Sequence, residues 1–274
     1  MNRVDAGFCT VPNPFNPKQK SHVSLRPRDV DVIVFWTRNP APLLPRLWEL
    51  DDRGYDYYFL YTLLAYPGEL EPNGIPAEES VRTFRRLADM TGPGRVVWRY
   101  DPIVLSSITD VEFHHRTFLH LAESLRDSTS RCIVSLVDSY KHTEARLCTL
   151  SERNIRFHRH TKSVLSELFP RMAEIARANG MMLTSCAEER DLTSFGVAPG
   201  KCIDDALIRD VFGRKVSHRK DPGQRAACGC VESRDIGVYD TCSRGCLYCY
   251  ATRSTAGVER NRERHDPRAE SLVT

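Results

Sequence analysis

Residues 31–40 read Asp-Val-Ile-Val-Phe-Trp-Thr-Arg-Asn-Pro, an apolar run that changes abruptly into a polar turn. A continuous apolar run of this length is typical of a β-strand buried on both faces, as the strands of a parallel sheet are. The proline at position 40 and the polar residues before it predict where the strand ends. We therefore expect a buried parallel strand over residues 31–36, with Arg38 and Asn39 just beyond its carboxyl end.

The same pattern of strand and turn recurs along the chain and alternates with helical periodicity. Strand-like runs occupy residues 55–64, 95–99, 132–137 and 181–186, and a short last strand is expected over 236–239. Apolar stripes predict helices over residues 43–50, 77–90, 109–125 and 162–179, and Thr109-x-x-Glu112 resembles a capping box that opens the third of them. Such alternation predicts parallel pairing with right-handed crossovers. The favoured fold is α/β, a partial or complete TIM-like (β/α) barrel, and an open doubly wound sheet is the alternative.

Three segments lack this periodicity. We expect an extended loop over residues 1–28, a cysteine-containing loop region over 190–233 and a polar C-terminal tail over 253–274. Residues 1–252 would then form a single barrel-like domain, a size that one hydrophobic core can support.

Polar residues follow each expected strand, where either fold places its functional groups. They are Arg38, Asn39, Tyr66, Arg99, Asp101, Asp138, Lys141, Cys186 and Glu188. Asn-Pro and Asp-Pro pairs are also common turn formers, so any single member of this set is explained equally well by a turn. As a set, these residues predict a site at one mouth of the barrel.

Composition is that of a soluble globular protein, with 41% hydrophobic and 27% charged residues in 274. No apolar run approaches the roughly 20 residues of a membrane span, and the start of the chain lacks the apolar core of a signal peptide, so we expect a cytoplasmic protein with no membrane partner. A net charge of +3 is too small to indicate nucleic-acid binding by itself. Seven of the ten cysteines follow residue 185, which in a reducing compartment points to metal binding or catalysis.

Three of these cysteines form one short motif over residues 242–249, Cys-Ser-Arg-Gly-Cys-Leu-Tyr-Cys. Three thiolates at this spacing can hold one face of a 4Fe-4S cluster and leave one iron open for chemistry. Gly245 allows the tight backbone turn that wrapping a cluster requires. A zinc site is the alternative, but zinc usually takes a fourth Cys or His nearby, and His265 lies sixteen residues beyond Cys249.

The motif Cys242-x3-Cys246-x2-Cys249, with Tyr248 before the last cysteine, resembles the signature loop of radical S-adenosylmethionine (SAM) enzymes. Together with residues 13–17 (Asn-Pro-Phe-Asn-Pro), 35–40, 98–102 (Trp-Arg-Tyr-Asp-Pro) and 228–242, it looks like a bacterial family of unknown function whose C-terminus carries this loop. The resemblance covers residues 8–252 and brings no established substrate.

This resemblance implies a mechanism and residue roles. The open iron would chelate SAM, and a reduced cluster would cleave it to methionine and a 5′-deoxyadenosyl radical that abstracts hydrogen from an unidentified substrate. Cys242, Cys246 and Cys249 would hold the cluster, Tyr248 would lie near the adenine, and Arg99 or Arg38 would pair with the SAM carboxylate. Asp101, Asp138 and Glu188 are candidates for ribose or substrate contacts. A flavodoxin or ferredoxin would supply the electron.

Two departures from these families bear on the fold. The cluster loop comes last, as though a radical-SAM barrel had been circularly permuted, and no Gly-Gly-Glu segment is found that would bind the SAM amino group. Members of the family also usually begin with a further strand carrying Ser-Arg-Arg-Thr-Asp. The present sequence starts beyond that point, so its start is either shortened or misassigned, and the completeness of the barrel is left open.

Four further cysteines raise the question of a second metal site. Cys186, Cys202, Cys228 and Cys230 are enough for a second 4Fe-4S cluster or a zinc ion. Cysteine is also often buried as a plain hydrophobic residue, which is our interpretation of Cys9, Cys132 and Cys148. Both explanations of the four cysteines stay open at this point.

Two other functions compete with the first. One is a non-catalytic zinc or iron-sulfur protein that uses Cys228, Cys230 and the 242–249 motif and contacts nucleic acid through the basic stretch 214–225 (Arg214, Lys215, Arg219, Lys220, Arg225). The other keeps the radical chemistry and acts on a nucleic-acid lesion, resembling spore photoproduct lyase.

Overall fold

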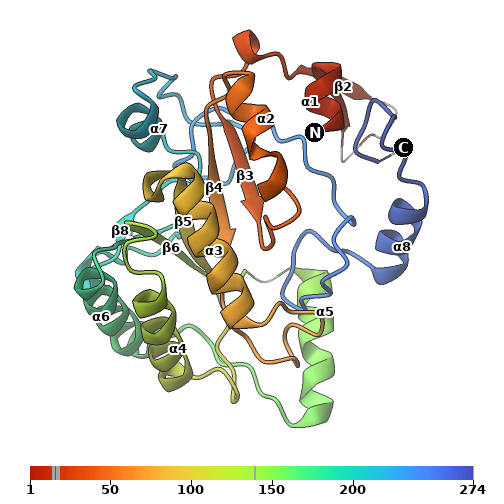
Figure 1. Ribbon diagram of the computed structural model, residues 1–274. Helices are drawn as coiled ribbons and strands as arrows, with labels where there is room; N and C mark the ends of the chain where they lie inside the picture. Colours follow the sequence, from red (N-terminus) through yellow and green to blue (C-terminus); the bar gives the residue numbers. More distant parts are fainter. Residues whose placement is uncertain (14–15, 17–18, 139, 274) are drawn as a thin grey trace.

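The computed structural model describes residues 1–13, 16, 19–138 and 140–273 (Figure 1). Pro14, Phe15 and Pro17 of the N-terminal motif, and Ser139 after the fourth expected strand, lie outside the described residues. Across the described ranges, no helix is both long enough and apolar enough to cross a membrane.

A parallel sheet forms the centre of the molecule. Within the described residues it has six strands in sequence order: β3 (Ile33–Thr37), β4 (Tyr57–Thr62), β5 (Val96–Ile103), β6 (Arg131–Leu136), β7 (Met182–Ser185) and β8 (Ala198–Pro199). A doubly wound sheet would reverse its strand order part-way, and this one does not. The alternating β/α units therefore correspond to a partial (β/α) barrel, as the sequence predicted.

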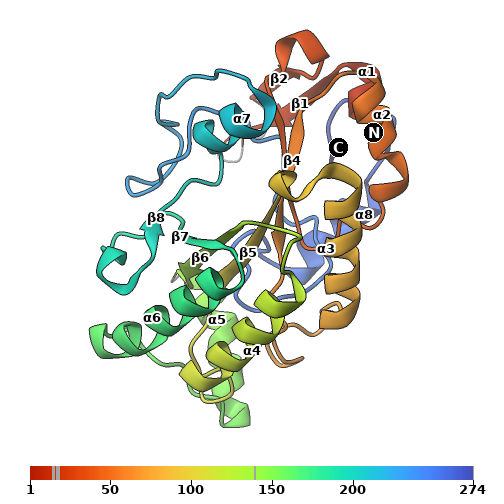
Figure 2. The ribbon, with the colours of Figure 1, turned by 60° about the vertical axis from the view of Figure 1, so that its left-hand side comes forward.

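Helices connect the strands. They are α2 (Leu47–Asp52), α3 (Ala77–Thr91), α4 (Val111–Ser124), α5 (Lys141–Cys148) and α6 (Lys162–Ala178). All but α5 cover one face of the sheet, and α5 lies beyond the ends of the strands (Figure 1). Figure 2 shows α3, α4 and α6 side by side on that face. Their apolar stripes supply Phe84, Phe118 and Leu168 to the main core. The predicted helices are thus confirmed, and α5 is an addition.

The start of α4 differs from the predicted capping box. Asp110, not Thr109, caps the helix, because its carboxylate accepts a hydrogen bond of 2.8 Å from the Phe113 backbone N–H. The Thr109 hydroxyl instead donates to the Val104 carbonyl at 2.7 Å inside the core. A buried hydroxyl needs such a partner, so Thr109 was not available as a cap.

The two faces of the sheet are covered differently. Alternate residues of β4 point to opposite sides, so Tyr57, Phe59 and Tyr61 pack beneath the helices while Tyr58 and Leu60 form what we call the inner face. Residues 202–231, including helix α7 (Asp205–Phe212), cover this inner face. The segment expected as a loop over 190–233 therefore also contains β8 and α7, and it fills space that further strands would enclose in a complete barrel.

The two ends of the chain lie together (Figure 1). Helix α1 (Asn2–Ala6) precedes an antiparallel hairpin of β1 (Phe8–Pro12) and β2 (Lys20–Ser24), where a loop was expected. Helix α8 (Thr255–Glu263) lies in the segment expected as a polar tail. After it, the backbone carbonyl of Glu270 accepts a 2.8 Å hydrogen bond from the Thr10 N–H, which fastens the C-terminal segment to β1.

The last expected strand, over residues 236–239, is wrong. The Asp235 carboxylate accepts a hydrogen bond from the Gly237 N–H at 2.7 Å, and Asp240 has a φ of 56°, so the backbone turns twice instead of extending. Asp and Gly favour such local turns over a strand ladder. The cysteine loop is therefore delivered by irregular backbone.

Phe84 tests the packing of α3 on the sheet. Its ring is fully buried and stacks on Tyr61 with a centroid separation of 5.2 Å. We expect Phe84→Ala to lower the free energy of unfolding by about 3–5 kcal/mol, because it leaves a cavity. Met90→Ala, at an exposed position of the same helix, should change it by less than about 0.5 kcal/mol. Equal effects of the two variants in denaturant titrations would contradict this packing.

A buried histidine makes the stability of the folded protein depend on pH. The Nε2–H of His114 donates to the Val104 carbonyl at 3.1 Å, and its Nδ1 accepts from the Tyr100 hydroxyl at 2.8 Å. Both ring nitrogens are therefore satisfied in the neutral form. Burial lowers the pKa of His114 to about 4.

The unfolded chain takes up a proton at this histidine near its ordinary pKa of about 6.5, whereas the folded protein does so only near 4. Stability should therefore fall as the pH drops from about 6.5 to 4, by about 3 kcal/mol for this group alone. His114→Gln should make the pH dependence of the unfolding free energy shallower in that window, and exposed His120→Gln should not. A pH slope unchanged by His114→Gln would contradict the neutral buried state.

Candidate functional site

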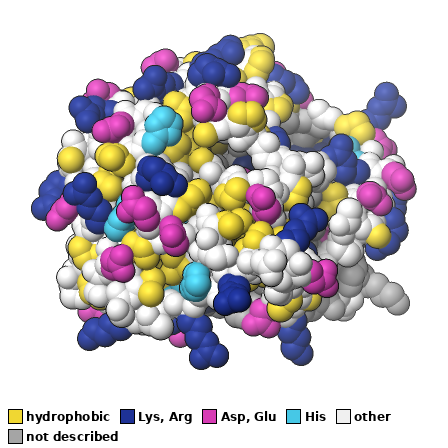
Figure 3. Space-filling view, turned by 90° about the horizontal axis from the view of Figure 1, so that it is seen from below, with side chains coloured by type: hydrophobic (Ala, Val, Ile, Leu, Met, Phe, Trp, Pro, Cys, Tyr) yellow, Lys and Arg dark blue, Asp and Glu magenta, His cyan; other side chains and the backbone are white. Residues whose placement is uncertain are grey.

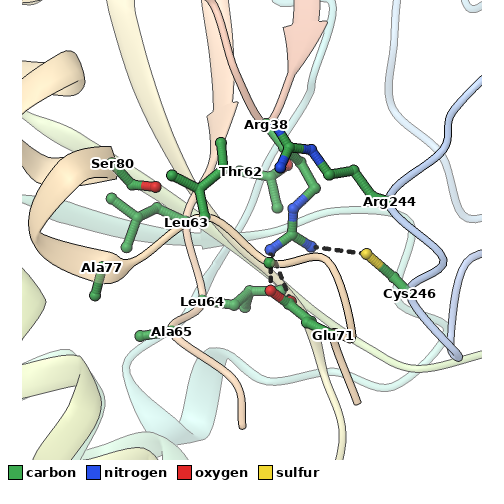
Figure 4. A pocket seen from close by; sticks show the side chains of 12 residues that line it. Arg38, Thr62, Leu63, Leu64, Ala65, Glu71, Ala77, Ser80, Arg244 and Cys246 are labelled. Atoms are coloured by element: carbon green, nitrogen blue, oxygen red, sulfur yellow. Dashed lines mark hydrogen bonds and ion pairs between the residues drawn. The ribbon is translucent and has the colours of Figure 1, made fainter. Parts of the chain in front are cut away.

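One network joins the C-terminal cysteine loop to the carboxyl ends of the first two strands of the parallel sheet (Figure 4). Arg38, the first residue after β3, donates from Nη2 to both carboxylate oxygens of Glu71 at 2.7 Å. Its Nη1 donates to the Tyr248 hydroxyl and lies 3.8 Å from the Cys246 sulfur. The Tyr248 hydroxyl in turn donates to Glu71. A residue just past β3 thus holds two residues of the motif at once.

Backbone contacts hold the loop on two further sides. Next to Glu71, the Asn73 side chain donates to the Ser243 carbonyl at 3.3 Å, and the Leu247 N–H donates to the Leu70 carbonyl at 3.0 Å. On α5, Arg146 donates to the Cys249 carbonyl and His142 donates to the Tyr250 carbonyl at 3.0 Å. The loop is therefore fixed on the barrel mouth from both the 70–73 segment and α5.

The three thiols of the motif are unpaired and differ in exposure. Cys246 is buried, Cys249 is half-buried and Cys242 is exposed. Burial raises the pKa of Cys246 to about 11, although the Arg38 guanidinium acts in the opposite direction. Gly245 has a φ of +68°, which allows the turn between the first two cysteines.

A small cavity lies beside Cys246 (Figure 4). Arg38, Leu63, Glu71, Arg244 and Cys246 are among the residues that line it. Its volume of about 10 Å³ is room for about one water molecule. The Arg244 guanidinium donates to the Asn73 carbonyl at 3.0 Å across this region. A larger ligand would therefore require side chains that line the cavity to move.

A second polar group lies on the inner face. Arg99 pairs with Asp101, whose other oxygen accepts a 2.5 Å hydrogen bond from the Ser135 hydroxyl. The Arg99 guanidinium lies 5.8 Å from the centre of the exposed Trp36 ring, and its Nε is buried with no hydrogen-bond partner among the described residues. Burial raises the pKa of Tyr250, just past Cys249, and the positive charge of Arg99 acts in the opposite direction. Arg99 is thus the strand-end arginine that keeps an unused donor.

The other residues predicted from the sequence have mostly internal partners. Tyr248 is buried and packs edge-on against Tyr66 at 5.6 Å, so its ring is a core residue. Asp138 pairs with Arg225. Glu188 accepts a 2.7 Å hydrogen bond from the Leu136 N–H, and burial raises its pKa. Arg38 is used fully by the loop network described above.

Sequence reasoning missed Glu71, Asn73 and Arg146, which fix the loop. None of them belongs to a motif, and each lies at least 103 residues from its partner in the loop. Glu71 is only 4% exposed, and a carboxylate that deep requires a cationic partner. The burial of Glu71 is visible only in the folded chain.

The four remaining cysteines converge at the β7–β8 end of the inner face. The Cys186 and Cys202 sulfurs are 3.0 Å apart. The Cys230 sulfur lies 3.3 Å from the backbone N–H groups of both Cys202 and Ile203, and the Cys228 thiol contacts Cys230. Donation from the Cys202 thiol lowers the pKa of Cys230 despite its burial. The predicted grouping of these cysteines therefore exists as a contact cluster.

The thiols of the 242–249 motif and those of the four-cysteine cluster are not arranged around a metal position in the structure. Within residues 1–13, 16, 19–138 and 140–273, no three His, Cys, Asp or Glu side chains are arranged to hold a metal ion. A metal at either group therefore requires the thiols to rotate and move apart.

Most of the basic stretch over 214–225 is neutralised within the fold. Arg214 pairs with Asp56, Arg219 with Glu232 and Arg225 with Asp138, and Lys220 donates to the Ala226 carbonyl at 2.7 Å. On a different face, the lower end of the molecule seen in Figure 3, basic and acidic side chains are likewise interspersed. Three of the five basic residues of this stretch are therefore ion-paired within the fold.

Comparison with known families gives one match, over residues 1–251, to a family described as "Domain of unknown function (DUF1848)". The chain belongs to the DUF1848 family. No curated protein and no solved structure matches it. The DUF1848 match extends past Cys249, so the cysteine loop and the barrel strands lie within the same family domain.

Glu71→Gln tests the loop network. The change removes the charge that faces Arg38, and we expect a loss of about 2–3 kcal/mol of unfolding free energy, below a fully buried pair because a quarter of the Arg38 side chain is exposed. Amide hydrogen exchange should also quicken at residues 242–250. Glu69→Gln, two positions away and exposed, is the matched control. Unchanged exchange at Leu247 in Glu71→Gln would contradict this role of Glu71.

Proposed function

We propose that the protein is a radical SAM enzyme in which Cys242, Cys246 and Cys249 hold a 4Fe-4S cluster that binds SAM. The observation that carries the proposal is the placement of the Cys-x3-Cys-x2-Cys loop, which Arg38 and Glu71 fasten over the carboxyl ends of parallel strands. Active sites of α/β barrels lie at that end.

The donor set suits such a cluster. All three thiols are unpaired and belong to one loop without regular secondary structure, so they can turn towards a common centre. Arg38 lies 3.8 Å from the Cys246 sulfur and would donate to it as a thiolate ligand, an outer contact that metal sites commonly use. The sequence motif leaves one iron without a protein ligand.

When bound, such a cluster supplies one-electron cleavage of SAM and the hydrogen-abstracting radical that results. The chain's own residues would position the cysteine loop and shield the reacting groups from water. Tyr248 and Arg38 hold the loop, and Trp36 and Tyr250 flank the inner-face group. The unpartnered Nε of Arg99 is available to an anionic group of SAM or of the substrate. A flavodoxin or ferredoxin would deliver the electron, and a reducing cytoplasm would keep the thiols available for the cluster.

Cys246→Ala tests this function in the reconstituted protein. After anaerobic treatment with iron and sulfide, the wild-type chain should gain about four irons at the loop and, once reduced, convert SAM to 5′-deoxyadenosine. Cys246→Ala should lose those irons and the product, because a cluster with two protein ligands is not retained. Cys148→Ala, an exposed cysteine on α5, should keep both.

Two results would refute the proposal. One is a colourless wild-type protein that takes up zinc at the loop and no iron. The other is undiminished formation of 5′-deoxyadenosine by Cys246→Ala, measured by chromatography of single turnovers.

A further inference from the structure

The four cysteines outside the motif form a cluster from three separate parts of the chain. Cys186 follows β7, Cys202 follows β8, and Cys228 and Cys230 lie in the irregular segment beyond α7. The Cys202 thiol contacts both Cys186 and Cys230, and Cys230 contacts Cys228. Cys202, Cys228 and Cys230 are buried and Cys186 is half-buried. Four thiols are therefore gathered into one chain of contacts.

The backbone around Cys230 is arranged for a negatively charged sulfur. The N–H groups of Cys202 and Ile203 both point at this sulfur at 3.3 Å. A neutral thiol is only a weak acceptor, so two buried N–H groups that rely on it would be poorly satisfied. A thiolate satisfies both, because hydrogen bonds to charged acceptors are the stronger kind.

The segment that carries Cys228 and Cys230 has no regular secondary structure to support it. Residues 213–233 contain no helix or strand, and their order rests on backbone hydrogen bonds, such as Asp221 N–H to Cys230 carbonyl at 3.0 Å and Val231 N–H to Ile203 carbonyl at 3.2 Å, and on ion pairs such as Arg219 with Glu232. Yet this segment covers the inner face of the sheet. Cross-linking by a metal is a common way to stabilise irregular backbone of this kind.

We propose that Cys186, Cys202, Cys228 and Cys230 form a four-thiolate metal centre, occupied by zinc or by an iron-sulfur cluster and separate from the 242–249 loop. Soft thiolates in a set of four are the ligands that both metals prefer. A buried group of thiolates also needs a cation to offset the cost of burying its charge.

The separation of the Cys186 and Cys202 sulfurs is compatible with a small movement. Four sulfurs about 2.3 Å from a tetrahedral metal stand about 3.8 Å apart, whereas Cys186 and Cys202 are 3.0 Å apart in the structure. Binding therefore spreads this pair by less than about 1 Å. Gly229 lies between the last two ligands, and a side chain there would come within 3.2 Å of Lys201, so glycine lets the two segments approach.

Metal counting in a chain without the loop site tests this centre. The full-length Cys246→Ala protein is stripped of metal under reducing, anaerobic conditions and then offered zinc in one sample and iron with sulfide in another. We expect about one zinc or about four irons per chain by elemental analysis. Adding Cys230→Ser should abolish this uptake, whereas adding Cys148→Ser should leave it unchanged. Cobalt offered in place of zinc should show thiolate-to-metal absorption that Cys230→Ser removes.

A second variant covers a failure to fold. Cys186→Ser changes the half-buried sulfur, and it should also lose the metal while keeping a cooperative unfolding transition. The proposal is overturned if the Cys246→Ala chain binds neither metal, if Cys230→Ser retains it, or if mass spectrometry finds Cys186 joined to Cys202 as a disulfide in the metal-loaded protein. Loss of SAM cleavage with this centre intact would refute only the proposed function of the loop.

Discussion

The ion pair between Arg38 and Glu71 is the constraint on which the candidate site depends. Glu71 is almost fully buried, so its charge requires the guanidinium, and the guanidinium in turn faces Tyr248 and Cys246. Arg38 and Tyr248 are 210 residues apart, and no strand pairing joins the loop to the sheet. The guanidinium is planar, and its Nη2 bonds Glu71 while its Nη1 bonds Tyr248, so its orientation is fixed as well as its position. One buried charge therefore substitutes for the strand that would otherwise deliver the loop.

The central sheet was largely predictable because its inner strands, above all β4, are buried on both faces, although β3 at the edge of the sheet is only half-buried, contrary to the expectation for residues 31–36. Their sequences are then continuous apolar runs, and the helices between them show a clear stripe, so position and type follow from periodicity alone. The wrong predictions of secondary structure lie where hydrogen bonds of local side chains override the hydrophobic pattern. Asp235 and Asp240 turn a stretch that resembles a strand, and Asp110 displaces Thr109 as a helix cap. In each case a short polar side chain bonds its own backbone.

The site was predictable only in part, for a different reason. Strand-end residues such as Arg38 and Arg99 could be identified because parallel strands share one carboxyl edge. Which of these arginines already has an internal partner could not be predicted, because partners such as Glu71 are not revealed by sequence spacing. The outcome reverses a simple expectation: Arg38 is consumed by holding the loop, while Arg99 keeps a buried donor without a partner among the described residues. Free ligand-binding capacity is a property of the fold, not of the residue type.

The way the inner face is covered explains why the two groups of cysteines have different surroundings. Side chains of β4, β5 and β6 on this face are covered by residues 202–231, which stand where more strands would close a barrel. Regular strands satisfy their own backbone groups, whereas an irregular cover must find other stabilisation. The sulfur cluster lies within this cover, and the motif loop lies at the mouth beside exposed aromatic side chains. Arg99 lies close enough to Cys186, Cys202 and Tyr250 to interact with them electrostatically, so a change of charge at Cys186 or Cys202 would act on the same guanidinium that faces the residue just past the motif loop.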